Sequence, residues 1–139
     1  MNPFDTFDIS ASGLTAQRQR LNVIAENLAN ANTTRTPEGG PYRRKHVVLE
    51  TQPVDDFASL LDSPQKVAVS QVLHDKQPFQ EEYDPGHPDA DENGIVRLPN
   101  VNPVQEMVSL TLASRAFEAN VAAIRSAKQM ALKALEIGR

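Results

Sequence analysis

The sequence contains no cysteine and no tryptophan, and only 5% of its 139 residues are aromatic. The lack of cysteine excludes disulfide scaffolds, thiol nucleophiles, thiolate zinc sites and iron–sulfur clusters. Two Tyr and five Phe are little material for a large compact core, because aromatic side chains supply much of the area that a core buries. The length favours one ordinary domain, or one small domain with extensions.

Long apolar runs are also missing. No stretch approaches the roughly 18 apolar residues of a membrane-spanning helix, so no transmembrane segment is expected. The first twelve residues include Asp5 and Asp8 and no basic residue, which differs from a cleavable secretory signal. The net charge is −4, and Arg43-Arg44-Lys45 is the only basic run. Nucleic acid is therefore not expected as a partner, because its binding usually requires a concentrated Lys/Arg face.

Proline and glycine divide the chain into three parts. Nine of the ten Pro and four of the six Gly lie between residues 33 and 103, whereas the two flanks contain few helix breakers. This distribution predicts a helix at each end and an irregular or β-rich middle. The expected boundaries are residues 1–33 for the first helical segment, 34–101 for an inserted lobe and 102–139 for the last helical segment.

The N-terminal segment carries a repeat of apolar residues. Asn2 is a good helix cap, and Pro3 suits the first helical position because its missing N–H would have no partner there. Apolar side chains then recur at intervals of seven, with Ile24 between two of them, and predict a coiled-coil seam in a helix that ends near Asn32. The seam residues are Phe7, Leu14, Leu21, Ile24 and Leu28.

The C-terminal segment predicts a longer helix, since no Gly or Pro occurs from residue 104 to residue 136. Asn102 is a suitable helix cap, and Pro103 suits the first helical position. Gln105, three residues after the cap, completes a capping-box pattern. At 1.5 Å per residue this helix is a rod of about 50 Å. Its apolar seam, with alternating spacings of three and four, includes Met107, Leu110, Phe117, Val121, Ile124 and Leu135.

The predicted fold class is α+β, mainly α. The N- and C-terminal helices form an antiparallel, coiled-coil-like pair, and the segment between them forms a small inserted β-rich lobe. Neither helix should be stable alone, because isolated helices are marginal without tertiary packing. Polar residues such as Gln17 and Lys128 interrupt the seams where a tight two-stranded coil has Leu or Ile. We therefore expect the pair to complete its burial against neighbouring subunits.

The middle of the chain predicts four short strands, bounded by clusters of Gly and Pro. These strands are expected to form a small sheet or a fragment of a barrel. Residues 55–63 are expected to form a helical turn or a loop. The four predicted strands cover residues 42–54, 66–73, 79–83 and 95–98.

Three asparagines fall within residues 27–32, which is unusual beside a strong helical seam. One interpretation is helix termination, in which Asn and Thr side chains cap the last turns. The other is that Asn27 and Asn30, one turn apart, present amides that fix the register against another chain. The two interpretations are compatible. Asn120, in the last helix, is a further candidate for setting register.

The sequence motifs that would indicate a metal, ligand or catalytic site are weak. Residues 89–94 resemble the start of an EF-hand loop, but its twelfth position is Asn100 rather than Glu and nearby prolines exclude flanking helices, so a solvated acidic turn is preferred to a calcium site. His46, His74 and His87 are far apart, and none has a second ligand three or four residues away. No glycine-rich phosphate loop or Gly-flanked serine is present. We expect no cofactor, no metal and no enzyme activity, and keep a calcium or small-ligand module as the rival.

Several segments resemble a known family. Residues 25–45 (AENLANANTTRTPEGGPYRRK) are similar to the N-terminal signature of the flagellar axial rod and hook proteins. Residues 84–102, residues 106–120 and the terminal ALEIGR resemble the same family, and the continuation RTPEGGPY points to its proximal-rod members. Together the similar segments run from residue 4 to residue 139, and residues 51–83 are the least distinctive.

The resemblance implies a structural role. Proteins of this family bring their terminal helices together in an inner layer around a narrow export channel, while the middle forms an outer lobe. Their subunits stack helically into a rod that crosses the periplasm and carries torque towards the hook. The implied partners are copies of the chain, other proximal and distal rod proteins, the adaptor to the membrane ring and the flagellar type III export apparatus, which exports the chain without signal cleavage.

Other assemblies also use paired terminal helices, so a type III secretion needle or translocator component, and an adaptor or chaperone, remain alternatives. Residues 25–45 and 84–103 favour the rod. In that interpretation the helical seams and the asparagines form the contacts within and between subunits. The predicted assembly residues are Phe7, Leu14, Leu21, Ile24, Asn27, Leu28, Asn30, Met107, Leu110, Phe117, Asn120, Val121, Ile124 and Leu135.

Overall fold

The computed structural model describes residues 3–53 and 65–137, in two long helices and four strands. The predicted α+β fold class is confirmed, and the strand at residues 95–98 has the predicted bounds. Residues 55–63, for which a turn or loop was expected, and the predicted cap Asn2 lie outside the described residues. The elements are α1 (Pro3–Ala29), β1 (Lys45–Pro53), β2 (Gln65–His74), β3 (Gln80–Tyr83), β4 (Ile95–Leu98) and α2 (Pro103–Ile137).

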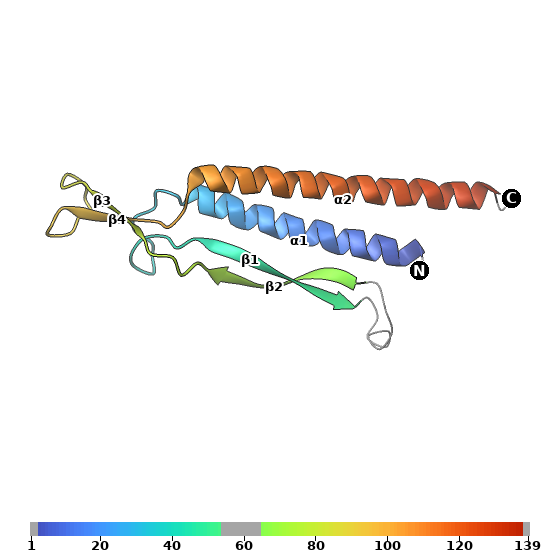
Figure 1. Ribbon diagram of the computed structural model, residues 1–139, viewed down its shortest axis with the longest axis horizontal. Helices are drawn as coiled ribbons and strands as arrows, with labels where there is room; N and C mark the ends of the chain where they lie inside the picture. The colour runs from blue at the N-terminus through green and yellow to red at the C-terminus, as the bar shows by residue number, and fades with distance from the viewer. Residues whose placement is uncertain (1–2, 54–64, 138–139) are drawn as a thin grey trace.

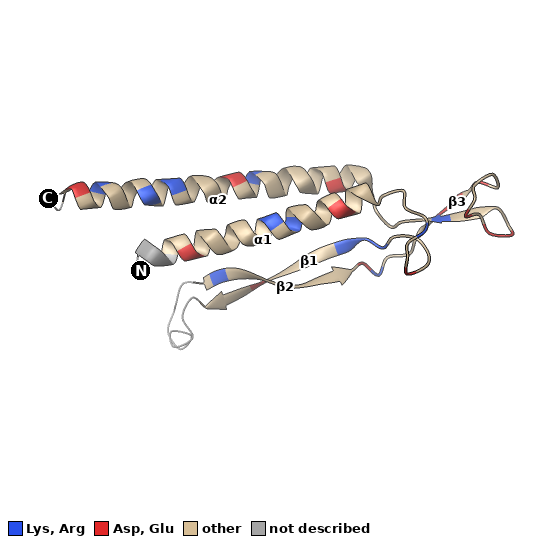
Figure 2. Ribbon diagram, turned by 180° about the vertical axis from the view of Figure 1, so that it is seen from behind, with Lys and Arg blue, Asp and Glu red and all other residues tan. Residues whose placement is uncertain are grey.

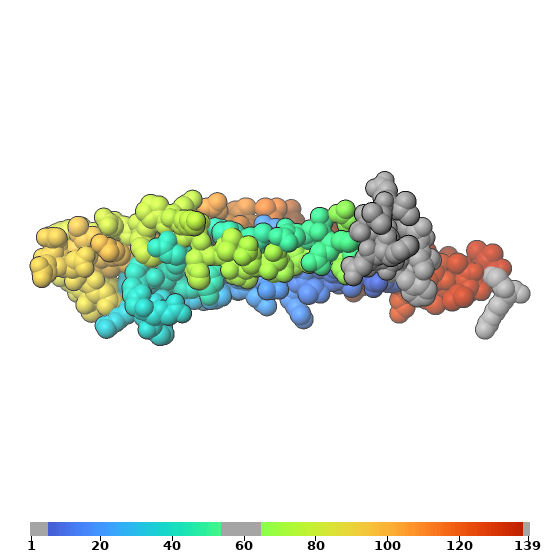
Figure 3. Space-filling view, turned by 90° about the horizontal axis from the view of Figure 1, so that it is seen from below, coloured from blue at the N-terminus to red at the C-terminus, as the bar shows by residue number. Residues whose placement is uncertain are grey.

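The elements lie side by side in an elongated molecule. Helices α1 and α2 run antiparallel, and the β1–β2 hairpin follows α1 on the side away from α2 (Figure 1). The β3–β4 hairpin forms one end of the molecule, and the C-terminal part of α2 forms the other, beyond the start of α1 (Figures 1 and 3). The two helices and the first hairpin thus form three layers that lie side by side, with their long axes in roughly the same direction.

Small residues hold the two helices together. Ala16 of α1 and Ala113 of α2 are each 1% exposed, and a Cβ atom added to Gly13 would lie 2.9 Å from Nδ2 of Asn120. The predicted seam residues Phe7, Leu14, Leu21 and Leu28 are only half-buried. The contact is therefore centred on small side chains that permit a close approach, and much of the larger seam is left at its edge.

The helix ends follow local capping rules. In α1 the Asn30 side chain donates to the Glu26 carbonyl (2.9 Å), which confirms its capping role, although the helix ends at Ala29 rather than near Asn32. In α2 the Asn102 Oδ1 accepts from the backbone N–H groups of Val104 (3.1 Å) and Gln105 (3.3 Å), so the predicted N-terminal cap is confirmed. The Asn102 cap satisfies backbone N–H groups that a helix start leaves without partners, whereas the Glu26 carbonyl also accepts from the Asn30 backbone N–H (3.1 Å).

The prediction of one small sheet is wrong for the described residues. β1 pairs only with β2 and β3 only with β4, in two separate antiparallel hairpins. The first hairpin is tied to α1, because the Ser12 Oγ accepts from the Val67 backbone N–H (3.1 Å). The second is closed by the Asp84 N–H, which donates to the Gly94 carbonyl (2.9 Å). Residues 89–94, the segment that resembles an EF-hand start, belong to the turn of this second hairpin.

Candidate assembly surface and its polar junction

A buried polar cluster joins the two helices to the first hairpin. It lies where α1 ends, α2 begins and β1 starts (Figure 1). We call it the polar junction, and its members are Asn27, Tyr42, Arg44, Lys45, Asp75, Asn100 and Glu106. Because these residues come from segments far apart in the sequence, the junction fixes how the three layers meet.

Asn27 is the centre of the junction, with a side chain that is 1% exposed. Its Nδ2 donates to the Lys45 carbonyl (2.8 Å) and to Oε2 of Glu106 (3.2 Å). Its Oδ1 accepts from the Tyr42 hydroxyl (3.0 Å) and the Lys45 backbone N–H (2.9 Å). Both donors and both acceptor positions of the amide are thus used inside the chain. The expectation that Asn27 faces another chain is therefore corrected. Its buried amide bonds to other segments of the same chain and sets their position relative to α1.

Glu106 and Arg44 form the charged half of the junction. The Glu106 carboxylate is 1% exposed, and its Oε1 accepts from Nε of Arg44 at 2.7 Å. The Arg44 Nη1 lies 3.3 Å from Oδ2 of Asp75, and the Arg44 backbone N–H donates to the Asn100 Oδ1 (2.8 Å). A buried carboxylate requires such partners, since its desolvation costs several kcal/mol.

The charges of the junction shift each other's titration. Burial lowers the pKa of Arg44, but hydrogen bonds and the negative charges of Glu106 and Asp75 outweigh it, so the pKa is raised. The backbone N–H of Gln77 lowers the pKa of Asp75, and Arg44 lowers it further. Both groups therefore remain charged over the physiological range.

The basic run at residues 43–45 is paired within the chain. Arg43 donates to the Asp75 carbonyl (3.0 Å) and lies over the Phe79 ring, 4.3 Å from its centre. Arg44 meets Glu106, and Lys45 forms an ion pair with Glu26. These three cations therefore serve the fold, and none of them needs an acidic partner from outside to be satisfied.

A second feature is the exposed apolar surface of α2. Leu112 is 58% exposed and Ile137 is 87% exposed, whereas a buried face of the same helix packs on α1. Uncharged residues at spacings of three, four and seven run along the side that includes both. We call this the outer stripe, and it consists of Leu112, Ala116, Ala119, Ala123, Ser126, Met130 and Ile137.

Comparison with known proteins connects these features to a family. Residues 7–35 match the family described as "Flagella basal body rod protein", and residues 92–137 match "Flagellar basal body rod FlgEFG protein C-terminal". The chain is 43% identical to the flagellar basal-body rod protein FlgC of Borreliella burgdorferi, over 99% of this chain and 98% of that protein. The chain belongs to the FlgC family. It is also 44% identical to FlgC of Bacillus subtilis over the full length of both, and 44% identical to FlgC of Escherichia coli O157:H7 over 96% of each.

FlgC membership confirms the resemblance seen in the sequence and makes the chain a structural rod protein of the flagellar basal body. Two of the segments that carried the resemblance, residues 25–45 and 84–102, supply most of the polar junction. They also touch outside it, where the Thr34 Oγ1 donates to Oδ2 of Asp89 (2.8 Å). The FlgC-like motifs are therefore the parts of the chain that meet at the end of the helix pair.

The predicted assembly residues of this FlgC family member fall into three groups. Ile24 and Asn27 are buried, and Met107 and Leu135 are exposed. The remainder lie half-buried along the helix pair, where a partner can still cover them. This half-buried group is Phe7, Leu14, Leu21, Leu28, Asn30, Leu110, Phe117, Asn120, Val121 and Ile124.

Sequence reasoning missed Glu106, Arg44 and Tyr42. One signal was available for Glu106: it lies seven residues before Ala113 and therefore shares the inner face of α2, where a carboxylate requires a partner. No comparable pattern identified Arg44, because its partners are 31 and 62 residues away in the sequence.

The described residues form neither a cluster of metal ligands nor a membrane-spanning helix. Among residues 3–53 and 65–137, no three His, Cys, Asp or Glu side chains are placed to hold a metal ion together. Within the same residues, neither helix is both long and apolar enough to span a membrane.

Tyr42 makes the junction sensitive to alkaline pH. Burial raises the pKa of its phenol to about 12, and the charges of Glu26 and Glu106 add to the effect. A raised pKa favours the folded state below the unfolded value of about 10, and this stability is lost as the pH rises towards about 12. We expect the free energy of unfolding to fall by on the order of 2 kcal/mol over this range. Urea unfolding at a series of pH values measures it.

The matched variants are Tyr42→Phe and Tyr83→Phe. The first removes the hydroxyl that donates to Asn27 and costs about 1 kcal/mol at neutral pH, but it lacks this alkaline loss. The second alters a ring that is 73% exposed, so its profile should follow the unmodified chain. If the free energy of unfolding of Tyr42→Phe fell with alkaline pH as steeply as that of the unmodified chain, the Tyr42 phenol would not be the cause of the loss.

Proposed function

We propose that the chain is a structural subunit of the proximal rod, which assembles helically around the export channel and transmits torque from the motor to the hook. The observation that carries the proposal is the apolar surface of α2, which remains exposed in a chain of the FlgC family. A single soluble molecule has no use for a row of exposed Leu, Met and Ile side chains, whereas a subunit covers them on assembly.

Burial of this surface supplies the energy for assembly. Covering one large apolar side chain contributes about 1.5–3 kcal/mol, so a few anchors give each contact useful affinity. The half-buried seam residues and the exposed Met107 and Leu135 contribute alongside the outer stripe. Asn27 is no longer among the proposed contacts, because its amide is used within the chain.

The layered fold suits torque transmission. Two helices and a hairpin lie along the same direction, and the polar junction and the Ser12–Val67 hydrogen bond tie them together (Figure 1). Buried side-chain networks with satisfied partners make such a contact rigid. The proposed partners are copies of the chain, other rod proteins, the ring adaptor and the type III export apparatus. The proposed role requires no cofactor and no enzyme activity.

Leu112→Asp tests the proposal. Leu112 lies on the outer stripe and is exposed, so the change should alter the free energy of unfolding by less than about 0.5 kcal/mol. In the assembled rod the new carboxylate would be buried without a partner, which costs several kcal/mol. We expect loss of rod assembly and of motility in cells that carry only this variant, together with normal amounts of the protein.

Gln19→Asp is the matched control, because it adds the same charge to an exposed polar position of α1, outside the stripe. Cells with this variant should assemble rods and swim. Normal motility with Leu112→Asp would remove the outer stripe, and with it the main support for the proposal.

A further inference from the structure

The two ends of the molecule carry opposite charge. The β3–β4 hairpin with its turn, residues 80–98, contains six carboxylates and one guanidinium, and we call it the acidic tip. The last three turns of α2, residues 125–137, contain three cations and one carboxylate, and we call this segment the basic tail. In the ribbon of Figure 2, segments coloured red for Asp and Glu gather around β3, and blue segments for Lys and Arg, with one red, lie towards the C-terminus of α2.

Each end also presents apolar surface. At the acidic tip, Tyr83 is 73% exposed, and its ring is held against Gly94, where an added Cβ atom would lie 3.0 Å from Cε2 of the ring. On the basic tail, Met130, Leu132 and Leu135 are all exposed. The acidic tip thus carries an exposed aromatic ring among carboxylates, and the basic tail carries exposed apolar side chains among cations. Exposed aromatic residues often supply much of the energy of an interface.

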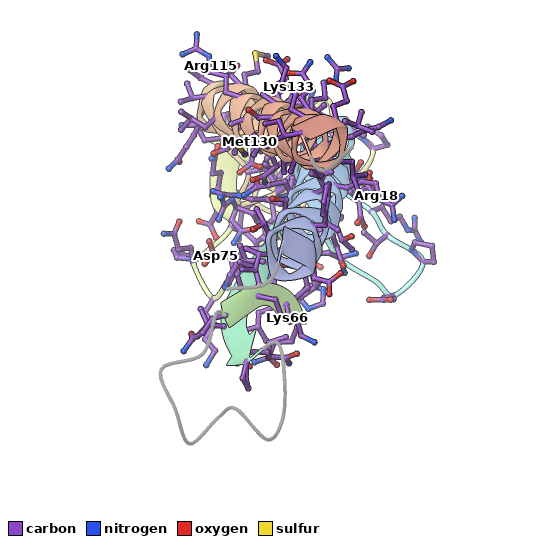
Figure 4. All side chains as sticks on the ribbon, turned by 90° about the vertical axis from the view of Figure 1, so that its right-hand side faces the viewer. Arg18, Lys66, Asp75, Arg115, Met130 and Lys133 are labelled. Carbon is purple, nitrogen blue, oxygen red and sulfur yellow. The ribbon has the colours of Figure 1, made fainter. Side chains whose placement is uncertain are left out.

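The basic tail is accessible at the end of the molecule. Lys133, one of its three cations, projects from α2 on the side away from the hairpin, in the view along the length of the molecule (Figure 4). This part of α2 extends past the start of α1, so it is reachable from more than one direction (Figures 1 and 3). Because the tip and the tail lie at opposite ends of an elongated chain, they cannot meet within one molecule.

We propose that the acidic tip of one copy docks on the basic tail of a second copy. The inference rests on the proposed function and specifies which surfaces meet along the rod. The two patches are different, so the contact is heterologous. A bound pair leaves one tip and one tail free, and further copies can add at both ends instead of the pair closing as a symmetric dimer. Complementary charge selects the partner and steers the encounter, while Tyr83 and the apolar tail residues supply buried area.

Charge exchange in the purified full-length chain tests the docking. The tip variant Glu82→Lys/Asp91→Lys/Glu92→Lys changes the net charge of the tip from −5 to +1, and the tail variant Lys128→Glu/Lys133→Glu changes that of the tail from +2 to −2. Each should weaken self-association at least tenfold, by about 1.4 kcal/mol or more. An equimolar mixture of the two should regain a series in which the variants alternate, because two of its four possible contacts are complementary: the unchanged tip with the unchanged tail, and the exchanged tip with the exchanged tail. The variant that carries both sets of changes should also regain the series. Sedimentation velocity measures each species.

Salt and cross-linking complete the test. Self-association should be strongest at about 0.01 M salt, where the screening length is about 30 Å, and weakest at about 1 M salt, where it is about 3 Å. A photoreactive aromatic amino acid at position 83 should cross-link to residues 125–137 of another copy. Glu50→Lys and Arg18→Glu, which change exposed charges elsewhere, are the controls and should associate like the unmodified chain.

The outcomes are separable. No self-association at low salt, no recovery when the tip and tail changes are combined, or cross-links that map outside residues 125–137 would each overturn the docking. Leu112 lies outside residues 125–137 and outside the acidic tip, so Leu112→Asp decides the proposed function independently of these results. Circular dichroism of each variant establishes that the exchanged chains remain folded.

Discussion

Replacing Glu106 by Ala is expected to lower the free energy of unfolding by about 3–5 kcal/mol, because it breaks a buried ion pair from one side. The change leaves the Arg44 guanidinium without its 2.7 Å partner and leaves one N–H of Asn27 without an acceptor. It also opens a cavity at the point where α2 begins. Urea unfolding followed by the helical signal measures the loss.

Glu118→Ala provides the control, since Glu118 is an exposed carboxylate on the same helix and its removal should cost less than about 0.5 kcal/mol. A double-mutant cycle of Glu106→Ala with Arg44→Ala should show coupling, because each residue is the other's partner. A loss below about 1 kcal/mol for Glu106→Ala, or additive single changes, would show that the ion pair does not hold the layers together.

The parts of the fold that follow local rules were predictable. Asn102 and Pro103 gave the start of α2, and β4 was predicted with the correct bounds, because capping and short apolar runs between turns act within a few residues. The lengths of both helices followed from the positions of Pro and Gly. The family resemblance was predictable for a similar reason, since it rests on continuous segments.

The arrangement of the hairpins was not predictable from the same signals. Strand pairing in the middle of the chain is decided by contacts over long sequence distances, such as the Ser12–Val67 hydrogen bond across 55 residues. That contact and its neighbours place β1–β2 along α1, so β3–β4 remains a separate hairpin. Alternation of Val and polar residues gives a strand but does not specify its partner.

The role of Asn27 shows the same limit at a single residue. Its position in the first helix suggested an amide that faces outward to another chain. The structure places its partners at Lys45 and at Glu106, 79 residues away, and none of these can be inferred from helical spacing. The motif around Asn27 therefore has a physical reason that only the folded chain reveals: both donors and both acceptors of one amide connect three layers.

Asn27→Asp is the sharpest test of that role, because it exchanges one NH2 group for an oxygen and keeps the shape. The introduced carboxylate would face Oε2 of Glu106 and the Lys45 carbonyl, where Asn27 donates two hydrogen bonds. We expect the free energy of unfolding to fall by about 3–5 kcal/mol at neutral pH, through an unpaired buried charge. Burial and the charge of Glu106 would raise the pKa of the introduced carboxyl above its unfolded value.

The pH dependence separates this mechanism from simple loss of packing. A carboxyl with a raised folded-state pKa favours folding below its unfolded pKa of about 3.9, and this contribution disappears as the pH rises through the folded value. The deficit of Asn27→Asp against the unmodified chain should therefore be largest at neutral pH and shrink as the pH falls towards 4. Asn30→Asp, three residues on, is the control: Asn30 is half-buried and gives up one hydrogen bond to Glu26, so its deficit should stay near 1 kcal/mol. Similar losses for the two variants, or a deficit for Asn27→Asp that does not change with pH, would mean that the Asn27 amide does not set the register of the layers.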